Sequence, residues 1–438
     1  MKKILILSTI TAATLFATNG DNLIGLGAES RALGGTGIAM YQGSENAMTN
    51  PALLGKTKGN KKEITIAGTF FKADVSASTT VSGDNPATPL IYDPFAGVER
   101  KSDVGMSVIP YISHAHRLSN SITMGFGIYG TAGMGVDYVK NDTPNTGDPK
   151  LFNMKSELQI MQIAPSIAYN KDNYGVGLTA IIQYGKLSID YDTHDGAGTL
   201  VKTDDDKMSS DTGFGFTIGG FYDIQNNVTI AAIYKSAIDM EYGNEISNAA
   251  SYFGYGKGTT ALAAKPDHLE QPAEIGLGFA ITHKTMTYTA DFKTIKWGDA
   301  KGYKDFGWED QNVIALGAKY SASNYWIGLG FNKSNNPIKN NKDKTYVRDS
   351  SRNATPGTQE NTNGDTMNVF NYVMFPGTIT KAYTFGGGYD LNKDSSIELA
   401  YTIMPEVSDT VSGATVGVGD LTTKHSQTAT TIAYKFTF

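Results

Sequence analysis

Few residues of this chain combine the type and the spacing that metal binding or catalysis requires. His114 and His116 stand two positions apart, so a β-strand would present both imidazoles on one face, as a metal pair would need. No third ligand lies nearby, and polar residues at an interface explain the pair better. The run Asp204-Asp205-Asp206 could bind Ca²⁺, but no EF-hand loop with its glycine surrounds it, which favours a solvated loop. We therefore expect neither a metal site nor a cofactor.

The sequence supports a catalytic site no better than it supports a metal site. Serine and histidine both occur, so lipase activity is conceivable, but no G-x-S-x-G sequence frames a serine. The sequence thus predicts a protein that is not an enzyme. Lysines could serve binding instead: Lys235 and Lys319 could neutralise the carboxylate head group of a ligand, although Asp239 could equally pair with one of them.

The composition indicates an exported protein. The 438 residues include 49 Gly, 24 Tyr and 19 Phe but no Cys, which excludes a disulfide framework and Cys-ligated metals. A chain without Cys also avoids mispairing in an oxidising compartment. The net charge of −6 is spread along the chain rather than gathered in blocks, which speaks against a nucleic-acid partner.

Residues 1–17 have the features of a signal peptide. Lys2-Lys3 supply the positive region, Ile4 to Phe16 the apolar region, and Ala17 a small residue for cleavage. The alternative is a short membrane anchor, but a spanning helix needs about 18 apolar residues and this run is shorter. No other stretch reaches that length, so no transmembrane helix is expected.

The segment that follows, residues 18–60, is rich in Gly and Ala and ends near Asn50-Pro51-Ala52. Each glycine weakens a helix by up to about 1 kcal/mol relative to alanine, so the segment is too Gly-rich to form a domain. It is also too apolar for a free tail. We interpret it as a hatch that plugs the lumen of a container formed by residues 61–438.

From residue 61 onward, apolar residues recur at alternate positions, as in Val176, Leu178, Ala180 and Ile182. Fourteen such segments follow one another, joined alternately by short turns and long polar stretches. Outer-membrane barrels show this alternation, with an even strand count. A soluble β-sandwich is the weaker alternative. The long stretches lie near residues 76–102, 139–153, 192–212, 243–271, 298–310, 336–378 and 410–425.

The faces opposite the apolar stripes are polar, as a lumen would be, and hold Gln183, Lys235, Asp239, Asp291, Lys293, Lys319 and Lys435. The chain ends on Phe438 with aromatic residues at alternate positions before it, a pattern that outer-membrane assembly machinery generally recognises. The sequence therefore predicts an all-β fold: a 14-stranded antiparallel transmembrane β-barrel with an N-terminal plug. It would reside in the outer membrane of a Gram-negative cell, as a monomer contacting outer-membrane lipid.

Several stretches resemble the FadL/TodX/OmpP1 family of outer-membrane transporters of hydrophobic compounds. Thr18 to Gly37 reads T-N-G-x-x-x-x-G-x-G-x-x-S-R-x-x-G-G-x-G, similar to that family's mature N-terminus, and Thr49-Asn50-Pro51-Ala52 is similar to its hatch motif. Gly127 to Tyr138 resembles its third strand, where a kink opens the barrel wall. Leu53-Leu54 departs from the pattern, because a glycine is expected there. Other short segments that are similar to the family's sequences are Ile163 to Tyr169, Gln271-Pro272-Ala273, Phe292 to Trp297 and Phe375-Pro376-Gly377.

The resemblance implies passive uptake of long-chain fatty acids or other hydrophobic compounds, with release through a lateral gap into the outer leaflet. The implied lateral gap comprises Gly130, Thr131, Ala132, Gly133 and Gly135. The implied ligand pocket comprises Leu158, Ile160, Ile181, Leu187, Lys235 and Lys319. An apolar group in the 243–271 stretch would dock ligand first, and comprises Tyr252, Phe253, Tyr255 and Leu262. Detergent would enter the same pocket in vitro. A general porin or a surface-adhesion barrel is the alternative.

Overall fold

The computed structural model describes residues 19–57, 62–80, 97–139, 154–194, 200–202, 208–225, 227–252, 267–340, 362–412 and 419–438. Over these residues, 17 strands join in one antiparallel sheet. The strands are β1 (Lys62–Thr79), β2 (Arg100–Lys101), β3 (Met106–Arg117), β4 (Ile122–Asp137), β5 (Met154–Ile163), β6 (Ser166–Lys171), β7 (Tyr174–His194), β8 (Leu200–Lys202), β9 (Ser209–Ile224), β10 (Val228–Lys235), β11 (Glu274–His283), β12 (Met286–Ile295), β13 (Gln311–Ser321), β14 (Tyr325–Ser334), β15 (Lys381–Asn392), β16 (Ser395–Ser412) and β17 (Asp420–Thr437).

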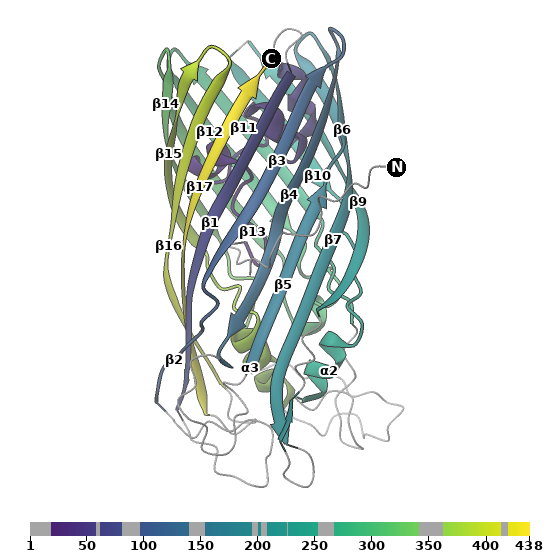
Figure 1. The fold of residues 1–438 in the computed structure, drawn as a ribbon, viewed down its shortest axis with the longest axis vertical. Helices are drawn as coiled ribbons and strands as arrows, with labels where there is room; N and C mark the ends of the chain where they lie inside the picture. Colours follow the sequence, from purple (N-terminus) through teal and green to yellow (C-terminus); the bar gives the residue numbers. More distant parts are fainter. Residues whose placement is uncertain are drawn as a thin grey trace, which may run out of the picture.

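The sheet closes into a barrel because β1 pairs with β17 on one side and with β3 on the other. β2 and β8 are short additions, and β5 and β6 together form one wall segment. The wall therefore has 14 strands, as the sequence predicts. Figure 1 shows the C-terminus and the short turns at one end of the barrel, and helices α2 and α3 toward the other.

Proline explains why one wall segment divides into β5 and β6. Pro165 has no amide hydrogen to donate to a neighbouring strand. The pairing with β4 still continues across the break, because Ala164 and Gly127 exchange backbone hydrogen bonds of 2.8 and 3.1 Å. The interruption is thus local.

Strand alternation separates an apolar outer face from a buried inner face. Ile66, Leu277 and Leu329 point outward with 56%, 58% and 67% of their surface exposed, whereas neighbours such as Ala67 are buried. In a bilayer the outward stripe contacts acyl chains, and closure of the barrel pairs the first strand, β1, with the last strand, β17. The apolar period in the sequence thus corresponds to the outer face.

The strands run further than the apolar stripes do. β5 begins at Met154 and β17 at Asp420, so β17 occupies part of the stretch near 410–425 that the sequence assigns to a loop. The outward side chains there are polar, among them Lys424 and Ser426. The apolar period therefore ends before the hydrogen-bond ladder does.

Helical elements are short. They are α1 (Ala28–Ala32), α2 (Glu245–Tyr252) and α3 (Thr362–Met374), with the 3₁₀ helices η1 (Gly43–Ala47), η2 (Pro51–Lys56) and η4 (Lys304–Phe306). Within the described ranges, none of the helices has both the length and the apolar character needed to cross a membrane.

The N-terminal segment, residues 19–57, lies inside the ring of strands (Figure 1). Nearly all of its residues are buried. Its backbone and side chains bond to inward groups of the wall, for example from the Gly34 nitrogen to Thr384 Oγ1 on β15 at 2.9 Å. Beside it, toward α3, apolar side chains of the wall and loops form the largest buried cluster, which includes Leu158, Trp297 and Phe370.

Candidate functional site

The inner wall carries glycines where the N-terminal segment approaches it. A Cβ atom at Gly317 would lie 2.7 Å from Cβ of Leu33, and one at Gly330 would lie 2.0 Å from the backbone nitrogen of Gly34. Because real Cβ atoms do not come this close, only glycine lets the segment lie against these strands. The same close approach occurs at Gly125, Gly127, Gly177, Gly219, Gly276, Gly278 and Gly386.

The predicted hatch motif, Asn50-Pro51-Ala52, packs on one such glycine pair. Gly177 on β7 and Gly219 on β9 are register partners, so together they leave the inner face bare. The Asn50 side chain donates to the carbonyl oxygen of Ile38 at 2.7 Å and accepts from the backbone nitrogen of Ala52 at 3.1 Å. Asn50 therefore caps η2 and ties two turns of the segment together.

Buried ion pairs attach the same segment to the wall. Lys435 Nζ on β17 lies 2.9 Å from Glu45 Oε2 and 3.1 Å from Glu398 Oε1. Lys319 on β13 pairs with Glu29. Both glutamates of the segment are thus held by lysines of the barrel, and a buried carboxylate that loses its partner is costly.

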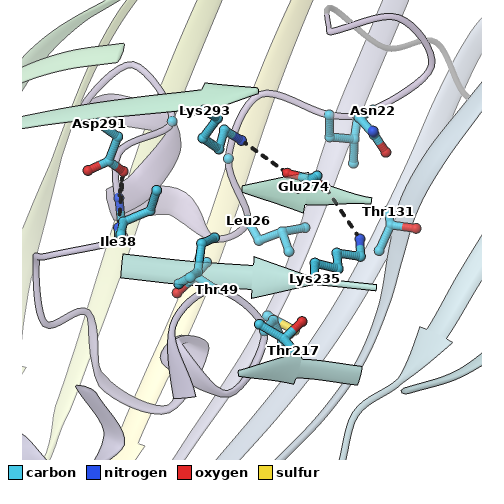
Figure 2. A pocket seen from close by; sticks show the side chains of 16 residues that line it. Asn22, Leu26, Ile38, Thr49, Thr131, Thr217, Lys235, Glu274, Asp291 and Lys293 are labelled. Atoms are coloured by element: carbon cyan, nitrogen blue, oxygen red, sulfur yellow. Dashed lines mark hydrogen bonds and ion pairs between the residues drawn. The ribbon is translucent and has the colours of Figure 1, made fainter. Parts of the chain in front are cut away.

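A cavity of about 90 Å³ lies between the N-terminal segment and strands β9 to β12. Figure 2 shows Lys235 and Lys293 turned toward Glu274, with ammonium nitrogens 3.6 and 3.7 Å from its two carboxylate oxygens. Asp291 accepts hydrogen bonds from two backbone nitrogens of the segment, at 2.8 and 3.0 Å. The charges of this cavity therefore balance largely among themselves.

Strand β4 changes partner halfway along its length. It pairs with β3 from Arg117↔Thr123 to Tyr111↔Tyr129, and within the described residues 97–139 no pair of these strands follows beyond Tyr129. A register shift lies between Gly130 and Ala132 in the pairing of β4 with β5. We call the stretch between β3 residues 106–110 and β4 residues 130–136 the β3–β4 interval.

The N-terminal segment supplies bonds that β3 does not make to β4 here. Leu23 donates its backbone N–H to the Thr131 carbonyl oxygen, and Gly133 donates to the Asp21 carbonyl oxygen, both at 3.1 Å. Beyond the interval, Asp103 donates to the Asp137 carbonyl oxygen at 2.7 Å and joins the two sides again. The interval is therefore bounded at both ends, and its glycines lie where the sequence places its implied lateral gap.

The four apolar residues of the predicted pocket come together in one buried cluster. Leu158 and Ile160 on β5 and Ile181 and Leu187 on β7 all face inward, next to the interval. Toward the end of the barrel with the long loops, Trp297, Tyr303 and Trp308 pack edge-on or tilted with ring centroids 4.5 to 5.2 Å apart. This region is mainly apolar, but the three rings also donate hydrogen bonds to polar residues: Trp297 to Gln311, Tyr303 to Asp21 and Trp308 to Asn371.

The two predicted lysines occupy different places. Lys235 lines the cavity of Figure 2, whereas Lys319 pairs with Glu29 and lies 5.4 Å from the Trp326 ring centroid. Asp239, which the sequence allows as a partner of either, instead bonds to Lys301 and His268 in the loops. Partial burial alone would raise the pKa of Asp239, but these hydrogen bonds hold it below its usual range.

The other predicted sites are placed as follows. Tyr252 ends α2, and Phe253, Tyr255 and Leu262 lie outside the described residues, as does Asp204-Asp205-Asp206. The rings of His114 and His116 lie 6.4 Å apart on β3. Among the described residues no group of three or more His, Asp or Glu side chains is arranged to hold a metal ion.

Sequence reasoning missed the wall contacts of the N-terminal segment. Glu29 and Glu45 are charges in an otherwise Gly- and Ala-rich stretch, and that contrast is the signal that could have shown their need for buried partners. The inward glycines left no signal of their own, because a glycine contributes nothing to an apolar or polar period.

Comparison with known proteins gives consistent matches. A family model described as outer membrane protein transport protein (OMPP1/FadL/TodX) matches residues 4–356. The crystal structure of the P. putida toluene transporter TodX has a TM-score of 0.67 at 17% identity, covering 95% of this chain and 99% of that one. That of a Pseudomonas aeruginosa FadL homologue has a TM-score of 0.64 at 15% identity, covering 98% and 99%. These structural likenesses establish the fold.

A curated relative matches over a shorter stretch. An uncharacterized protein in the phosphoenolpyruvate carboxykinase gene 5' region of Chlorobium limicola is 44% identical over 86 residues. The match spans 19% of this chain and 42% of that relative's length. It therefore adds sequence kinship without adding a function.

Proposed function

Because the chain belongs to the outer membrane protein transport protein family (OMPP1/FadL/TodX), we propose that it takes up hydrophobic compounds and releases them sideways through the β3–β4 interval. The family is one of outer-membrane transport β-barrels and not of enzymes. The similar solved structures include toluene transporters and a FadL homologue, so the ligands proposed here are long-chain fatty acids or aromatic hydrocarbons.

The proposed route begins at the extracellular loops. Ligand docks on the apolar group of the 243–271 stretch, passes to the buried cluster around Leu158 and Ile181, and leaves between β3 and β4. Returning an apolar solute to water costs about 25 cal/mol per Å² of its surface. A sideways exit into lipid avoids this cost, whereas an aqueous exit to the periplasm does not.

The hatch, residues 18–60, blocks the straight route in this proposal. Its support is the contact of the N-terminal segment with glycines of the wall and its ion pairs to Lys319 and Lys435. A general porin would need an open aqueous lumen, and the filled lumen disfavours that alternative. Recognition of Phe438 by the barrel-assembly machinery stays a prediction.

The observation that carries the proposal is the change of partner along β4. Unpaired backbone groups in hydrocarbon cost several kcal/mol each, so a wall with an opening must satisfy them in another way. Leu23 and Asp21 do so for Thr131 and Gly133, at 3.1 Å each. These two bonds reduce that penalty where β4 has no β3 partner.

Replacing Gly133 by arginine tests the proposal. Gly133 pairs with Gln159 on the outer face of the interval, where a long charged side chain would obstruct an apolar ligand. We expect bound ligand to persist in the purified variant while cellular uptake falls to the level of cells without the protein. Thr428→Arg is the control, since Thr428 is an outward polar residue on β17, which β1 separates from β3. Full uptake by an inserted Gly133→Arg variant would contradict lateral release.

A further inference from the structure

The outer face of the barrel changes character at the height of the β3–β4 interval. On β7 the apolar stripe ends at Tyr184, and the next outward residue, Lys186, pairs with Gln159 of β5. On β1 the stripe ends at Phe70, and the next outward residue is Lys72. The interval therefore opens at the edge of the apolar band, where acyl chains give way to head groups.

One side of the interval is polar on its outer face. Gly133 and Gly135 of β4 have no side chains, and their register partners on β5 are Gln159 and Glu157. Gln159 Nε2 donates to Glu157 Oε1 at 2.5 Å, and Lys155 lies 3.9 Å from the other oxygen of Glu157. Glu157 is only 7% exposed although Leu158 beside it faces the lumen. Bare glycines thus lie along a hydrogen-bonded polar edge.

The other side is apolar. Met106 and Val108 of β3 point outward with 64% and 42% of their surface exposed. Val108 is paired with Phe70 of β1, which continues the apolar surface away from the interval. A molecule passing between β3 and β4 would therefore meet polar side chains on one flank and apolar ones on the other.

We propose that the interval selects amphipathic molecules: the polar end follows Gln159 and Glu157 on β5 while the alkyl tail enters lipid beside Met106 and Val108 on β3. The proposal rests on the proposed lateral release and adds a specificity to it. The ligand class is a long alkyl chain with one hydrogen-bonding head group. Gln159 and Glu157 are specificity residues at the exit, outside the buried pocket.

The physical reason is the cost of moving a polar group through hydrocarbon. A hydroxyl or carboxyl group that loses its hydrogen bonds resists transfer into an apolar surrounding. A polar edge leading from the lumen to the head-group layer lets that group exchange one hydrogen-bond partner for another. A pure hydrocarbon has no such group and gains nothing from Gln159 or Glu157.

The test compares 1-hexadecanol with hexadecane, which share one chain length, as labelled compounds taken up by cells. In the Glu157→Leu/Gln159→Leu double variant we expect hexadecanol uptake to fall about tenfold, equivalent to about 1.4 kcal/mol. Hexadecane uptake should stay within about twofold of wild type by the same relation. Glu157→Gln, which keeps hydrogen-bonding atoms, should retain hexadecanol uptake. The matched control is Ser426→Leu/Thr428→Leu, two outward polar residues at the same spacing on β17.

The outcomes separate this inference from lateral release itself. Equal losses for both compounds, or no loss for either, would overturn the amphipath selection. Gly133→Arg should stop both compounds, and if it stops neither, lateral release fails and this inference fails with it. Should the double leucine variant not insert, the single variant Gln159→Met gives the same comparison, since it removes the donor to Glu157 and keeps the side-chain length.

Discussion

Replacing Gly177 by alanine should loosen the N-terminal segment without unfolding the barrel. A Cβ atom there would lie 2.4 Å from the backbone nitrogen of Ala52 and 2.5 Å from the carbonyl carbon of Pro51. Backbone atoms cannot swing aside as a flexible side chain does. The wall cannot yield either, because β7 is paired on both sides, through Ala168↔Gly177 and Gly177↔Gly219.

The energetic cost of the substitution follows from the overlap of the added Cβ atom with the backbone of Pro51 and Ala52. Forcing an extra carbon into a packed site costs about 1–3 kcal/mol. That energy corresponds to about a 5- to 150-fold change in an equilibrium constant. The strand itself does not suffer, because alanine is favoured over glycine in a strand by roughly 0.5–1 kcal/mol. The strain therefore acts on the docking of Asn50-Pro51-Ala52, and the undocked population of the segment should rise by that factor.

Single-channel recording in planar bilayers measures the effect. Gly177→Ala should show more frequent or longer conducting events than wild type, while heat-modifiable migration reports a folded barrel. The control is Gly68→Ala on β1, where an added Cβ has no atom within 4 Å. A folded Gly177→Ala protein with the conductance of wild type would refute the reasoning that this glycine lets the segment close the lumen.

Two further predictions concern charges. Lys435→Met leaves Glu45 and Glu398 buried without their ammonium, so the free energy of unfolding in detergent should drop by about 3–5 kcal/mol, measured by urea titration; an unchanged midpoint would contradict it. The hydrogen bonds of Asp239 to Lys301 and His268 hold the pKa of this carboxyl group lower in the folded protein than in the unfolded chain. They therefore stabilise the loops fully above the unfolded-state pKa, and this stabilisation is lost as the pH falls through the lower folded-state pKa. Loop proteolysis should therefore be the same at pH 7 and pH 5 and rise only below about pH 4; a rise already at pH 5 would contradict it.

Much of the fold can be predicted from the sequence because the bilayer imposes a simple rule on it. Outward residues such as Ile66 and Leu277 must be apolar, so period two marks each strand. The rule fails where strands leave the apolar band. On β17 the outward residues from Thr422 to Thr430 are polar, and the strand there is held by its pairing with β1 and β16.

The candidate site is predictable only where a residue type has few roles. The glycines from Gly130 to Gly135 lie where the pairing of the described β4 with β3 has ended, and the role of this stretch as an exit stays a prediction. Lysines are less informative. The sequence predicts that Lys235 and Lys319 both face the lumen, but the two lysines have separate partners, Glu274 and Glu29. Which carboxylate a lysine meets depends on register and on the path of the N-terminal segment, and neither is encoded locally.

The two halves of the lumen are filled by different parts of the chain. Toward the short turns, the wall presents glycines such as Gly177 and Gly330, so backbone of the N-terminal segment fills the space at close range. Toward the long loops, β5 and β7 present Leu158 and Ile181, so side chains create an apolar interior. The β3–β4 interval lies beside that apolar interior, where β4 takes Asp21 and Leu23 as partners. In the proposed route, a ligand that reaches the end of the apolar interior meets close-packed backbone ahead and a wall without β3 pairing beside it, and this contrast is our reason for proposing the sideways path.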